Sequence, residues 1–452
     1  MKLQTVHSVF FIGIGGIGMS ALARYFRFLG KNVAGYDKVE TPLTNDLEAL
    51  GIAIHFDDDI ANVPHDFKNP DDTLVVYTPA VPSLHSELHF FKTHGFKVVK
   101  RSEALGIITK DSFCLAVAGT HGKTTTSCIL AHILNEVQTP MTAFLGGISE
   151  DFDSNFVYKG ADYSVVEADE YDRSFLHLSP DIACITSMDA DHLDIYGDGE
   201  TLIESFKEFA GKLKPGGQLV ICNGLEIKGL TYGIEDDSDY CIRNIRIDAG
   251  AYIFDIKTPT ETIKEVRFQK PGRHNLLNGL AAYTMAVQAV PQPHRLAMAL
   301  GTFKGVRRRF SYQINEENLV FIDDYAHHPK EIDAVYQAVT EMHPNHLVTV
   351  VFQPHLFSRT RDFAEGFADS LSRFDCILLL EIYPAREQPI AGITSSWLLD
   401  KIDNPNKKLV QKENLLEEVK NCKSNVLITM GAGDIGLEVP KLKKELAYAS
   451  QS

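Results

Sequence analysis

The chain has 452 residues, a length that predicts two to four domains, each large enough to bury its own core. Hydrophobic residues make up 44% and charged residues 23%, values close to a globular average that exclude a disordered or fibrous chain. The 44 Lys and Arg against 60 Asp and Glu give a net charge of −16, which disfavours nucleic acid and anionic membranes as partners and requires any phosphate to bind in a local pocket.

Apolar runs of strand length alternate with amphipathic stretches of helix length, which predicts an α/β fold with parallel sheets covered by helices. The pattern predicts three units, over residues 1–107, 108–314 and 315–452. The expected strands are 8–13, 32–37, 73–78, 113–118, 164–168, 181–187, 218–223, 319–323, 346–352, 376–382 and 425–430. The expected helices include 19–29, 43–51, 124–136, 274–290 and 293–302, and residues 241–257 are expected to form a small antiparallel appendage.

A glycine-rich turn with Gly13, Gly15, Gly16 and Gly18 follows the first predicted strand and opens a helix. Backbone N–H groups and the helix N-terminus can approach a diphosphate there without obstruction by a Cβ atom. Asp37 ends the next strand, where an acidic group can accept a hydrogen bond from a ribose hydroxyl. On their own these residues favour NAD and an NAD-dependent oxidoreductase, although such a turn can also serve packing alone.

A second loop, GTHGKTT, joins the strand FCLAVA to a helix and predicts an ATP site. Its amides can cradle β- and γ-phosphates, the lysine supplies a positive charge, and the threonine after it can bind Mg²⁺. Val117 stands where the strict motif has its first glycine. A nucleotide-gated regulatory protein is a further alternative, because phosphate loops also act as switches. The loop residues are Gly119, Thr120, His121, Gly122, Lys123, Thr124 and Thr125.

Acidic clusters at residues 167–170 and 189–194 follow strands of the same unit. Carboxylates at the carboxyl ends of parallel strands face the phosphate loop and can bind a metal ion, although loop acids that cap helices give the same pattern. A third polar run, 323–329, follows a later strand, and arginines cluster at 307–309 and around Arg359. In an acidic chain these arginines indicate anion binding or the balancing of nearby acids.

The seven cysteines form an odd-numbered set without a C-x-x-C pair. This set fits neither a disulfide framework nor a zinc site and predicts a cytoplasmic protein. Cys114, Cys128 and Cys184 lie in apolar surroundings and are expected in the core. No apolar run reaches the roughly 18 residues of a membrane-spanning helix, and polar residues and glycines interrupt the apolar start, so we predict no membrane segment and no signal peptide.

The segments GTHGKTT, VEADE, DADHLD, GRHNLLN, RRRF and DDYAHHP, in this order, resemble the Mur ligase family over almost the whole chain. The resemblance implies a Rossmann-like domain for a UDP-sugar at 1–107, a P-loop ATPase domain at 108–314 and a Rossmann-like domain for an amino acid at 315–452. The first glycine turn and Asp37 would then bind the UDP-sugar rather than NAD.

Within the family, FQPH, SRTRDF and GAGDIG favour ATP-dependent ligation of L-alanine to the lactyl carboxylate of UDP-N-acetylmuramate through an acyl phosphate. This is a cytoplasmic step of peptidoglycan precursor synthesis. A murein-recycling ligase that joins a preformed tripeptide to the same nucleotide sugar is the alternative. The resemblance leaves the oligomeric state open.

The resemblance also implies roles for individual residues. Lys123, His327 and Arg359 are expected to be catalytic, with His327 as a candidate proton acceptor. Metal binding, of Mg²⁺ with Mn²⁺ as a possible substitute, is assigned to Thr124, Glu167 and His192. The ATP site further includes Asn275, Arg309 and Asp324, and the amino-acid site consists of Tyr325, His327, His355 and Arg359.

Two positions depart from the family pattern. Leu356 follows His355 where many alanine-adding members have Arg, which leaves Arg359 as the expected carboxylate clamp. Phe206 stands where later-acting members carry a carbamylated lysine, with Lys207 next to it, so we predict no carbamylation.

Overall fold

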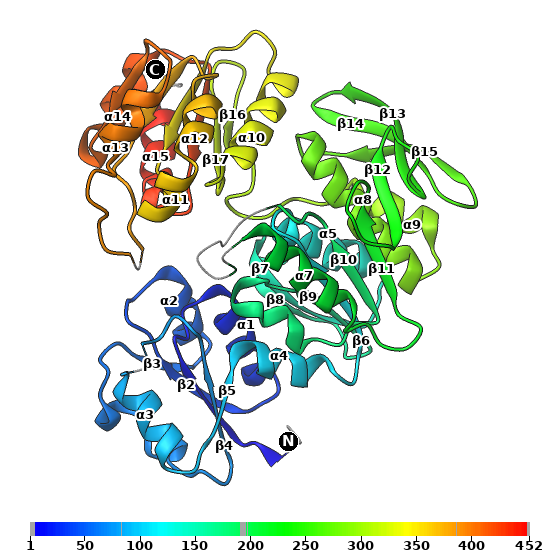
Figure 1. Ribbon diagram of the computed structural model, residues 1–452, viewed down its shortest axis with the longest axis vertical. Helices are drawn as coiled ribbons and strands as arrows, with labels where there is room; N and C mark the ends of the chain where they lie inside the picture. Colours follow the sequence, from blue (N-terminus) through cyan, green and yellow to red (C-terminus); the bar gives the residue numbers. More distant parts are fainter. Residues whose placement is uncertain (1–4, 83, 190–195, 197, 386, 450–452) are drawn as a thin grey trace. The chain divides into compact units, whose positions relative to one another are not determined.

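The computed structural model describes residues 5–82, 84–189, 196, 198–385 and 387–449. Three sheets flanked by helices form within these residues (Figure 1), and the predicted α/β class is confirmed. The chain divides into two compact units. The first comprises Met1–Ile247, Ile253–Phe268 and Leu277–Lys304, and the second Asp248–Tyr252, Gln269–Leu276 and Gly305–Ser452.

The first sheet is built from β1 (Ser8–Ile12), β2 (Asn32–Tyr36), β3 (Ala53–His55), β4 (Thr73–Tyr77) and β5 (Lys97–Lys100), with helices α1 (Ile17–Phe28), α2 (Pro42–Ala49), α3 (Ser86–Thr93) and α4 (Arg101–Thr109). It is parallel, in the order β3-β2-β1-β4-β5. Val9 and Phe11 enter one hydrophobic core, and Phe10 and Ile12 enter another. Because β1 is buried on both faces, its sequence is a continuous apolar run.

The second sheet is mixed and follows the order β15-β14-β13-β12-β11-β10-β6-β9-β7-β8 within the described residues. Its strands are β6 (Phe113–Ala118), β7 (Met141–Ser149), β8 (Ser154–Tyr158), β9 (Tyr163–Glu167), β10 (Ile182–Ile185), β11 (Gln218–Cys222), β12 (Leu230–Ile234), β13 (Tyr240–Asp248), β14 (Ala251–Lys257) and β15 (Thr262–Phe268). The helices of this region are α5 (Lys123–Glu136), α7 (Gly199–Ala210), α8 (Arg273–Ala289) and α9 (Pro293–Leu300).

The segment 241–257 differs from its prediction. It forms β13 and β14, which continue the large sheet instead of a separate appendage, because β13 pairs in parallel with β12. β12 was not predicted, and without it the sequence gives no link between this segment and the sheet.

The third sheet has the order β16-β17-β21-β18-β19-β20 and is parallel except for the β16–β17 pair. Its strands are β16 (Ser311–Asn315), β17 (Val320–Asp324), β18 (Val348–Phe352), β19 (Cys376–Leu379), β20 (Lys407–Leu409) and β21 (Val426–Met430). Its helices are α10 (Pro329–Met342), α11 (Phe357–Asp362), α12 (Ala364–Leu371), α13 (Ser395–Lys401), α14 (Leu415–Cys422) and α15 (Val439–Ala449).

Arg308 lies against the glycine-rich turn that follows β21. Its guanidinium donates to the carbonyl oxygens of Gly431 at 2.7 Å and Gly433 at 3.5 Å, and to the Asp323 carboxylate at 3.2 Å. The Asp323 side chain is buried, and Thr429 donates to it at 2.9 Å. Arg308 therefore joins the segment before β16 to the carboxyl ends of β17 and β21.

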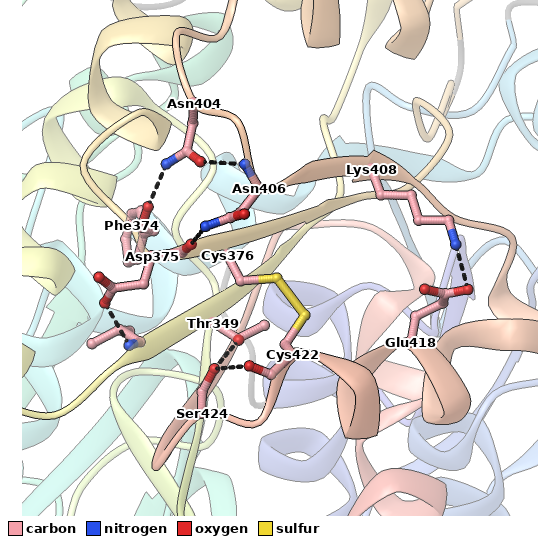
Figure 2. The surroundings of a disulfide bond; sticks show 11 residues. Thr349, Phe374, Asp375, Cys376, Asn404, Asn406, Lys408, Glu418, Cys422 and Ser424 are labelled. Carbon is pink, nitrogen blue, oxygen red and sulfur yellow. Dashed lines mark hydrogen bonds and ion pairs between the residues drawn. A yellow bond between two sulfur atoms is a disulfide. The ribbon is translucent and has the colours of Figure 1, made fainter.

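One cysteine pair departs from the sequence prediction. Cys376 at the start of β19 and Cys422 at the end of α14 form a disulfide, with Cα atoms 6.4 Å apart and a sequence separation of 46 residues (Figure 2). The two positions meet only through the folded sheet, so their spacing along the chain could not indicate the bond. Cys114, Cys128 and Cys184 are buried, as predicted, and are not part of this disulfide.

The membrane prediction can be compared with the helices in the described part of the chain. None of them combines the length and the apolar character that crossing a bilayer requires.

Candidate active site

The predicted phosphate-binding loop connects β6 to α5. Gly119 and Gly122 have φ angles of +134° and +82°, a region that side chains with a Cβ rarely adopt. A Cβ on Gly119 would also overlap the Thr186 hydroxyl. The glycines are therefore required both by the backbone conformation of the loop and by its close packing.

Hydroxyl groups from the segment after β10 hold this loop in place. The Ser187 hydroxyl accepts from the backbone N–H of His121 at 2.8 Å and contacts the Thr120 hydroxyl at 2.9 Å. The Thr186 hydroxyl donates to the carbonyl oxygen of His121. Thr186 and Ser187 were not predicted as loop contacts from the sequence, although they follow β10, the parallel neighbour of β6.

Lys123 begins α5, and the structure brings it to Glu170, a member of the acidic cluster at 167–170 for which no individual role was predicted. Its ammonium donates to the carbonyl oxygens of Gly119 at 2.6 Å and Thr120 at 3.3 Å, and to the Glu170 carboxylate at 2.9 Å. Burial lowers the pKa of Lys123, but the negative charges of Glu170 and Glu167 outweigh this effect and raise it. The ammonium is therefore charged at neutral pH.

Thr124 and Glu167 are the predicted metal ligands that lie in the described residues. Glu167 ends β9, which pairs in parallel with β6, so it lies at the edge of the sheet from which the loop leads into α5 and Thr124. The Glu167 carboxylate lies so close to Gly146 of β7 that a Cβ there would overlap it. Hydroxyl and carboxylate oxygens are ligands that Mg²⁺ prefers, so this donor set fits the ion. His192, the third predicted ligand, lies outside the described residues. Within the described residues, no group of three or more His, Cys, Asp or Glu side chains could hold a metal ion.

Asn278 on α8 is a loop contact that the sequence analysis missed. Its side-chain oxygen accepts from the Thr126 hydroxyl at 3.3 Å and lies against Gly122, where a Cβ would overlap it. Asn275, which was predicted for the ATP site, donates to the carbonyl oxygen of Pro271 at 2.7 Å within the second unit. The signal for Asn278 was its position three residues after Asn275 in the motif GRHNLLN, a spacing that places both on one face of a helix.

The glycine turn of the first sheet is closed by Asp37. Its carboxylate accepts from the backbone N–H of Gly15 at 2.7 Å and of Lys38 at 2.8 Å. The residue that caps α1 is Gly16, which has no side chain to bond the first N–H groups of the helix. Arg101, which was not predicted for this site, lies so close to Gly18 that a Cβ there would overlap its guanidinium.

The predicted amino-acid residues gather at the carboxyl ends of β17 and β18. The rings of Tyr325 and His327 have centroids 5.4 Å apart, and those of His327 and His355 are 6.1 Å apart. Arg359 on α11 is buried. Burial of His327 lowers the pKa of that histidine, and the positive charge of Arg359 lowers it further. All four predicted residues thus belong to one cluster in the second unit.

The environment of His327 determines its protonation. Burial lowers the pKa of His327, and the negative charge of Glu331 does not compensate. The ring Nδ1 lies 2.9 Å from the carbonyl oxygen of Tyr325 and 3.2 Å from Glu331. Because both neighbours of Nδ1 are acceptors, we assign the proton of the neutral ring to Nδ1, which leaves Nε2 as the proton acceptor.

Arg309 and Asp324, both predicted for the ATP site, also lie in the second unit. The Arg309 guanidinium lies over the Tyr325 ring at 5.1 Å from its centroid. The carboxylate of Asp324 accepts from the backbone N–H of Phe310 at 2.6 Å and of Ala326 at 2.7 Å. Burial raises the pKa of Asp324 to about 6. Asp324 thus connects the segment before β16 to the end of β17.

The two positions that depart from the family pattern differ in their surroundings. Leu356, directly after His355, has a φ angle of +71° and precedes α11. Phe206 is buried on α7 and packs its ring against Phe175 at 5.5 Å. Lys207 beside it pairs with Glu204 at 2.7 Å, with both side chains largely exposed.

Three family models match consecutive parts of the chain: Mur ligase family, catalytic domain, at residues 8–113, Mur ligase middle domain at 117–286, and Mur ligase, glutamate ligase domain, at 308–434. A UDP-N-acetylmuramate–L-alanine ligase from Flavobacterium psychrophilum is 60% identical over 446 residues, which cover 99% of each chain. The chain belongs to the Mur ligase family. A UDP-N-acetylmuramate–L-alanine ligase from Christiangramia forsetii is 58% identical, again over 99% of each chain.

Solved structures agree with this membership. The UDP-N-acetylmuramate-alanine ligase from Thermotoga maritima superimposes with a TM-score of 0.83 at 28% identity, covering 98% of this chain and all of its own. A murein peptide ligase from Psychrobacter arcticus gives a TM-score of 0.68 at 21% identity, covering 96% of this chain and 98% of its own, and shows a likeness of fold alone. The predicted three-domain α/β class is confirmed by the first of these structures.

Proposed function

We propose that this Mur ligase joins L-alanine to the lactyl carboxylate of UDP-N-acetylmuramate with the hydrolysis of ATP, a step of peptidoglycan precursor synthesis. The observation that carries the proposal is the 60% identity, over 99% of both chains, to an L-alanine ligase. The phosphate loop and the cluster around His327 give it a chemical basis. A cytoplasmic location remains the prediction made from the sequence.

The first step activates the carboxylate, which is a poor electrophile at neutral pH. A carboxylate oxygen attacks the γ-phosphorus of ATP, and the bond between this phosphorus and the β,γ-bridging oxygen breaks. ADP departs as the leaving group, and the substrate carboxylate becomes an acyl phosphate. The amides of residues 119–125 and the charged Lys123 bind the phosphate oxygens and offset negative charge in the transition state. Thr124, Glu167 and His192 would hold Mg²⁺ or Mn²⁺, which would supply further positive charge at these oxygens.

The second step forms the amide bond. The amine of alanine attacks the acyl carbon, and inorganic phosphate leaves from the tetrahedral intermediate. The amine must be neutral to attack, and Nε2 of His327 accepts its proton. The buried Arg359 binds the alanine carboxylate through paired hydrogen bonds, while Tyr325 and His355 line the same site.

The remaining predicted residues bind the two nucleotides. The turn of Gly13, Gly15, Gly16 and Gly18, together with Asp37, takes the UDP-sugar. Asn275, Arg309 and Asp324 complete the ATP site. An NAD-dependent oxidoreductase would leave the phosphate loop without a role, and the family membership gives it no support.

The decisive experiment measures phosphate release from Mg-ATP with UDP-N-acetylmuramate, with L-alanine or with the tripeptide L-Ala-γ-D-Glu-diaminopimelate as acceptor. Turnover with alanine supports the proposal. Turnover with the tripeptide but not with alanine would identify the protein as a murein-recycling ligase and overturn the proposed amino-acid site. Tight NADH binding without ATP turnover would revive the oxidoreductase.

The proton-acceptor role of His327 has its own test. The lowered pKa of His327 predicts that alanine-dependent kcat/KM falls on the acid side, with a midpoint below the ordinary histidine pKa of about 6.5. His327→Ala should remove this limb of the profile, whereas His343→Ala, at a histidine of the same unit with a similarly lowered pKa, should retain it. An unchanged profile in the His327 variant would rule out the assignment.

A further inference from the structure

All hydrogen-bond donors of the Lys123 ammonium are engaged within the protein. An ammonium has three N–H donors, and here they bond the carbonyl oxygens of Gly119 and Thr120 and the carboxylate of Glu170. For Lys123 to bond a phosphate oxygen, one of these three partners must be released. The two partners that are not released keep their bonds to Lys123 and hold the ammonium in place during the reaction.

Glu170 is the costliest partner to release. Its side chain has 0% exposure, so moving the ammonium away would separate a buried ion pair. The bond to Thr120 is the longest of the three at 3.3 Å and involves a neutral acceptor. The hydroxyl of Tyr196 also donates to the backbone carbonyl of Glu170 at 2.5 Å, which fixes this residue in place.

We propose that Glu170 is a positioning residue that keeps its ion pair with Lys123 while ATP is bound, so that the lysine exchanges its bond to Thr120 for a phosphate oxygen. The inference rests on the proposed ATP-dependent reaction and extends it to a residue outside the predicted site. The carboxylate directs the ammonium toward the loop and offsets the cost of burying its charge. Glu170 thus acts through Lys123 and does not itself touch the reacting atoms.

The test compares Glu170→Gln, which keeps the shape but removes the charge, with Asp172→Asn as the matched control. Asp172 lies two residues away and pairs with Lys100 at 2.8 Å instead of with the loop. We measure kcat, the KM for ATP, and the affinity for the non-hydrolysable analogue AMP-PCP. Glu170→Gln should lower kcat by up to about 100-fold, the effect of a misplaced catalytic group, and change the KM for ATP by less than about threefold. Asp172→Asn should match the wild type.

Each other outcome overturns the proposal. Tighter AMP-PCP binding with unchanged kcat would mean that ATP displaces Glu170 from the lysine. A higher Mg²⁺ requirement with full activity at saturating Mg²⁺ would assign Glu170 to the metal. Equal losses in Glu170→Gln and Asp172→Asn would indicate a structural role. Wild-type phosphate release with alanine is measured first, because its absence counts against the proposed function and not against Glu170.

A second variant and a double variant guard against a folding defect. Glu170→Asp keeps the charge but shortens the side chain, and it should retain more kcat than Glu170→Gln. In a Lys123→Ala background, Glu170→Gln should cause no additional loss of kcat or of AMP-PCP affinity. Additive losses would overturn the proposal, because a residue that acts through Lys123 has no effect once the lysine is gone.

Discussion

The side-chain oxygen of Asn278 occupies the space that a Cβ on Gly122 would need. The contact joins α8 to the phosphate-binding loop, across 156 positions of the sequence. Gly122 is therefore constrained twice, by its φ angle of +82° and by its neighbour.

Gly122→Ala should weaken AMP-PCP binding by at least about tenfold, because the added Cβ would overlap the Asn278 oxygen and displace the loop proposed to bind the phosphates. Gly216→Ala is the matched control, because Gly216 has the same φ angle of +82° but no heavy atom within 4 Å of its Cβ position. It should lower the free energy of unfolding by about 1 kcal/mol and leave binding unchanged. Titration calorimetry and denaturant unfolding separate the two effects, and equal behaviour of the two variants would contradict the steric argument.

Arg308→Ala should lower the free energy of unfolding by about 3 kcal/mol, because Asp323 would remain buried without its counter-ion. Urea unfolding gives this value. In Arg373→Ala the lost ion pair with Asp333, in which both side chains are 46% exposed, should contribute only about 0.5 kcal/mol. Similar losses in both variants would show that burial of the Arg308 pair is unimportant.

Asp324→Asn should change how stability depends on pH. The folded-state pKa of about 6 lies above the unfolded value of about 3.9, so the contribution of Asp324 is fully present below pH 3.9 and is lost as the pH rises through 6. The free energy of unfolding of the wild type relative to Asp324→Asn should therefore fall by roughly 2 kcal/mol between pH 4 and pH 7.

Urea unfolding at several pH values checks this slope. Asp255→Asn is a control of opposite sign, because the hydrogen bond from Asn244 lowers the pKa of Asp255. Its stabilising contribution is present above the unfolded pKa and is lost as the pH falls. A flat difference between wild type and Asp324→Asn would refute the raised pKa.

Cys376→Ser should lower the free energy of unfolding by about 4 kcal/mol under oxidising conditions, the chain-entropy value for a loop of 46 residues. The kinetic constants should not change, because Cys376 is at the amino end of β19 and His355 follows the carboxyl end of β18, its parallel neighbour. A thiol reductant should abolish the difference in stability. Cys222→Ser, at a free cysteine, should respond equally with and without reductant.

The central strands could be predicted from the sequence because they are buried on both faces. β1 and β6 are continuous apolar runs followed by glycine turns, and no tertiary information is needed to recognise them. The short strands β3, β5 and β20 were missed. They carry polar residues such as His55 and Lys97, and their strand conformation depends on pairing with a neighbour that lies far away in the sequence.

Those parts of the site that lie within local sequence motifs could be predicted from the sequence. The loop around Lys123 and the cluster around His327 each lie on one or two consecutive segments, so their spacing reveals them. Ser187 and Asn278 reach the loop through separate elements, and the choice of Glu170 as the partner of Lys123 depends on side-chain orientation. Those contacts depend on the three-dimensional fold and leave no signal in the local spacing of the sequence.

The turn after β21 has the sequence pattern Gly431-x-Gly433-x-x-Gly436, with the same glycine spacing as the turn that begins at Gly13. In this second copy the carbonyl oxygens of Gly431 and Gly433 face a guanidinium of the same chain. A nucleotide fingerprint instead directs its N–H groups toward an anion. The two turns share one consensus, but the first directs an N–H group toward a carboxylate and the second directs carbonyl oxygens toward a cation. A motif search that counts both turns would therefore assign a dinucleotide site to the second turn, where Arg308 is bound instead.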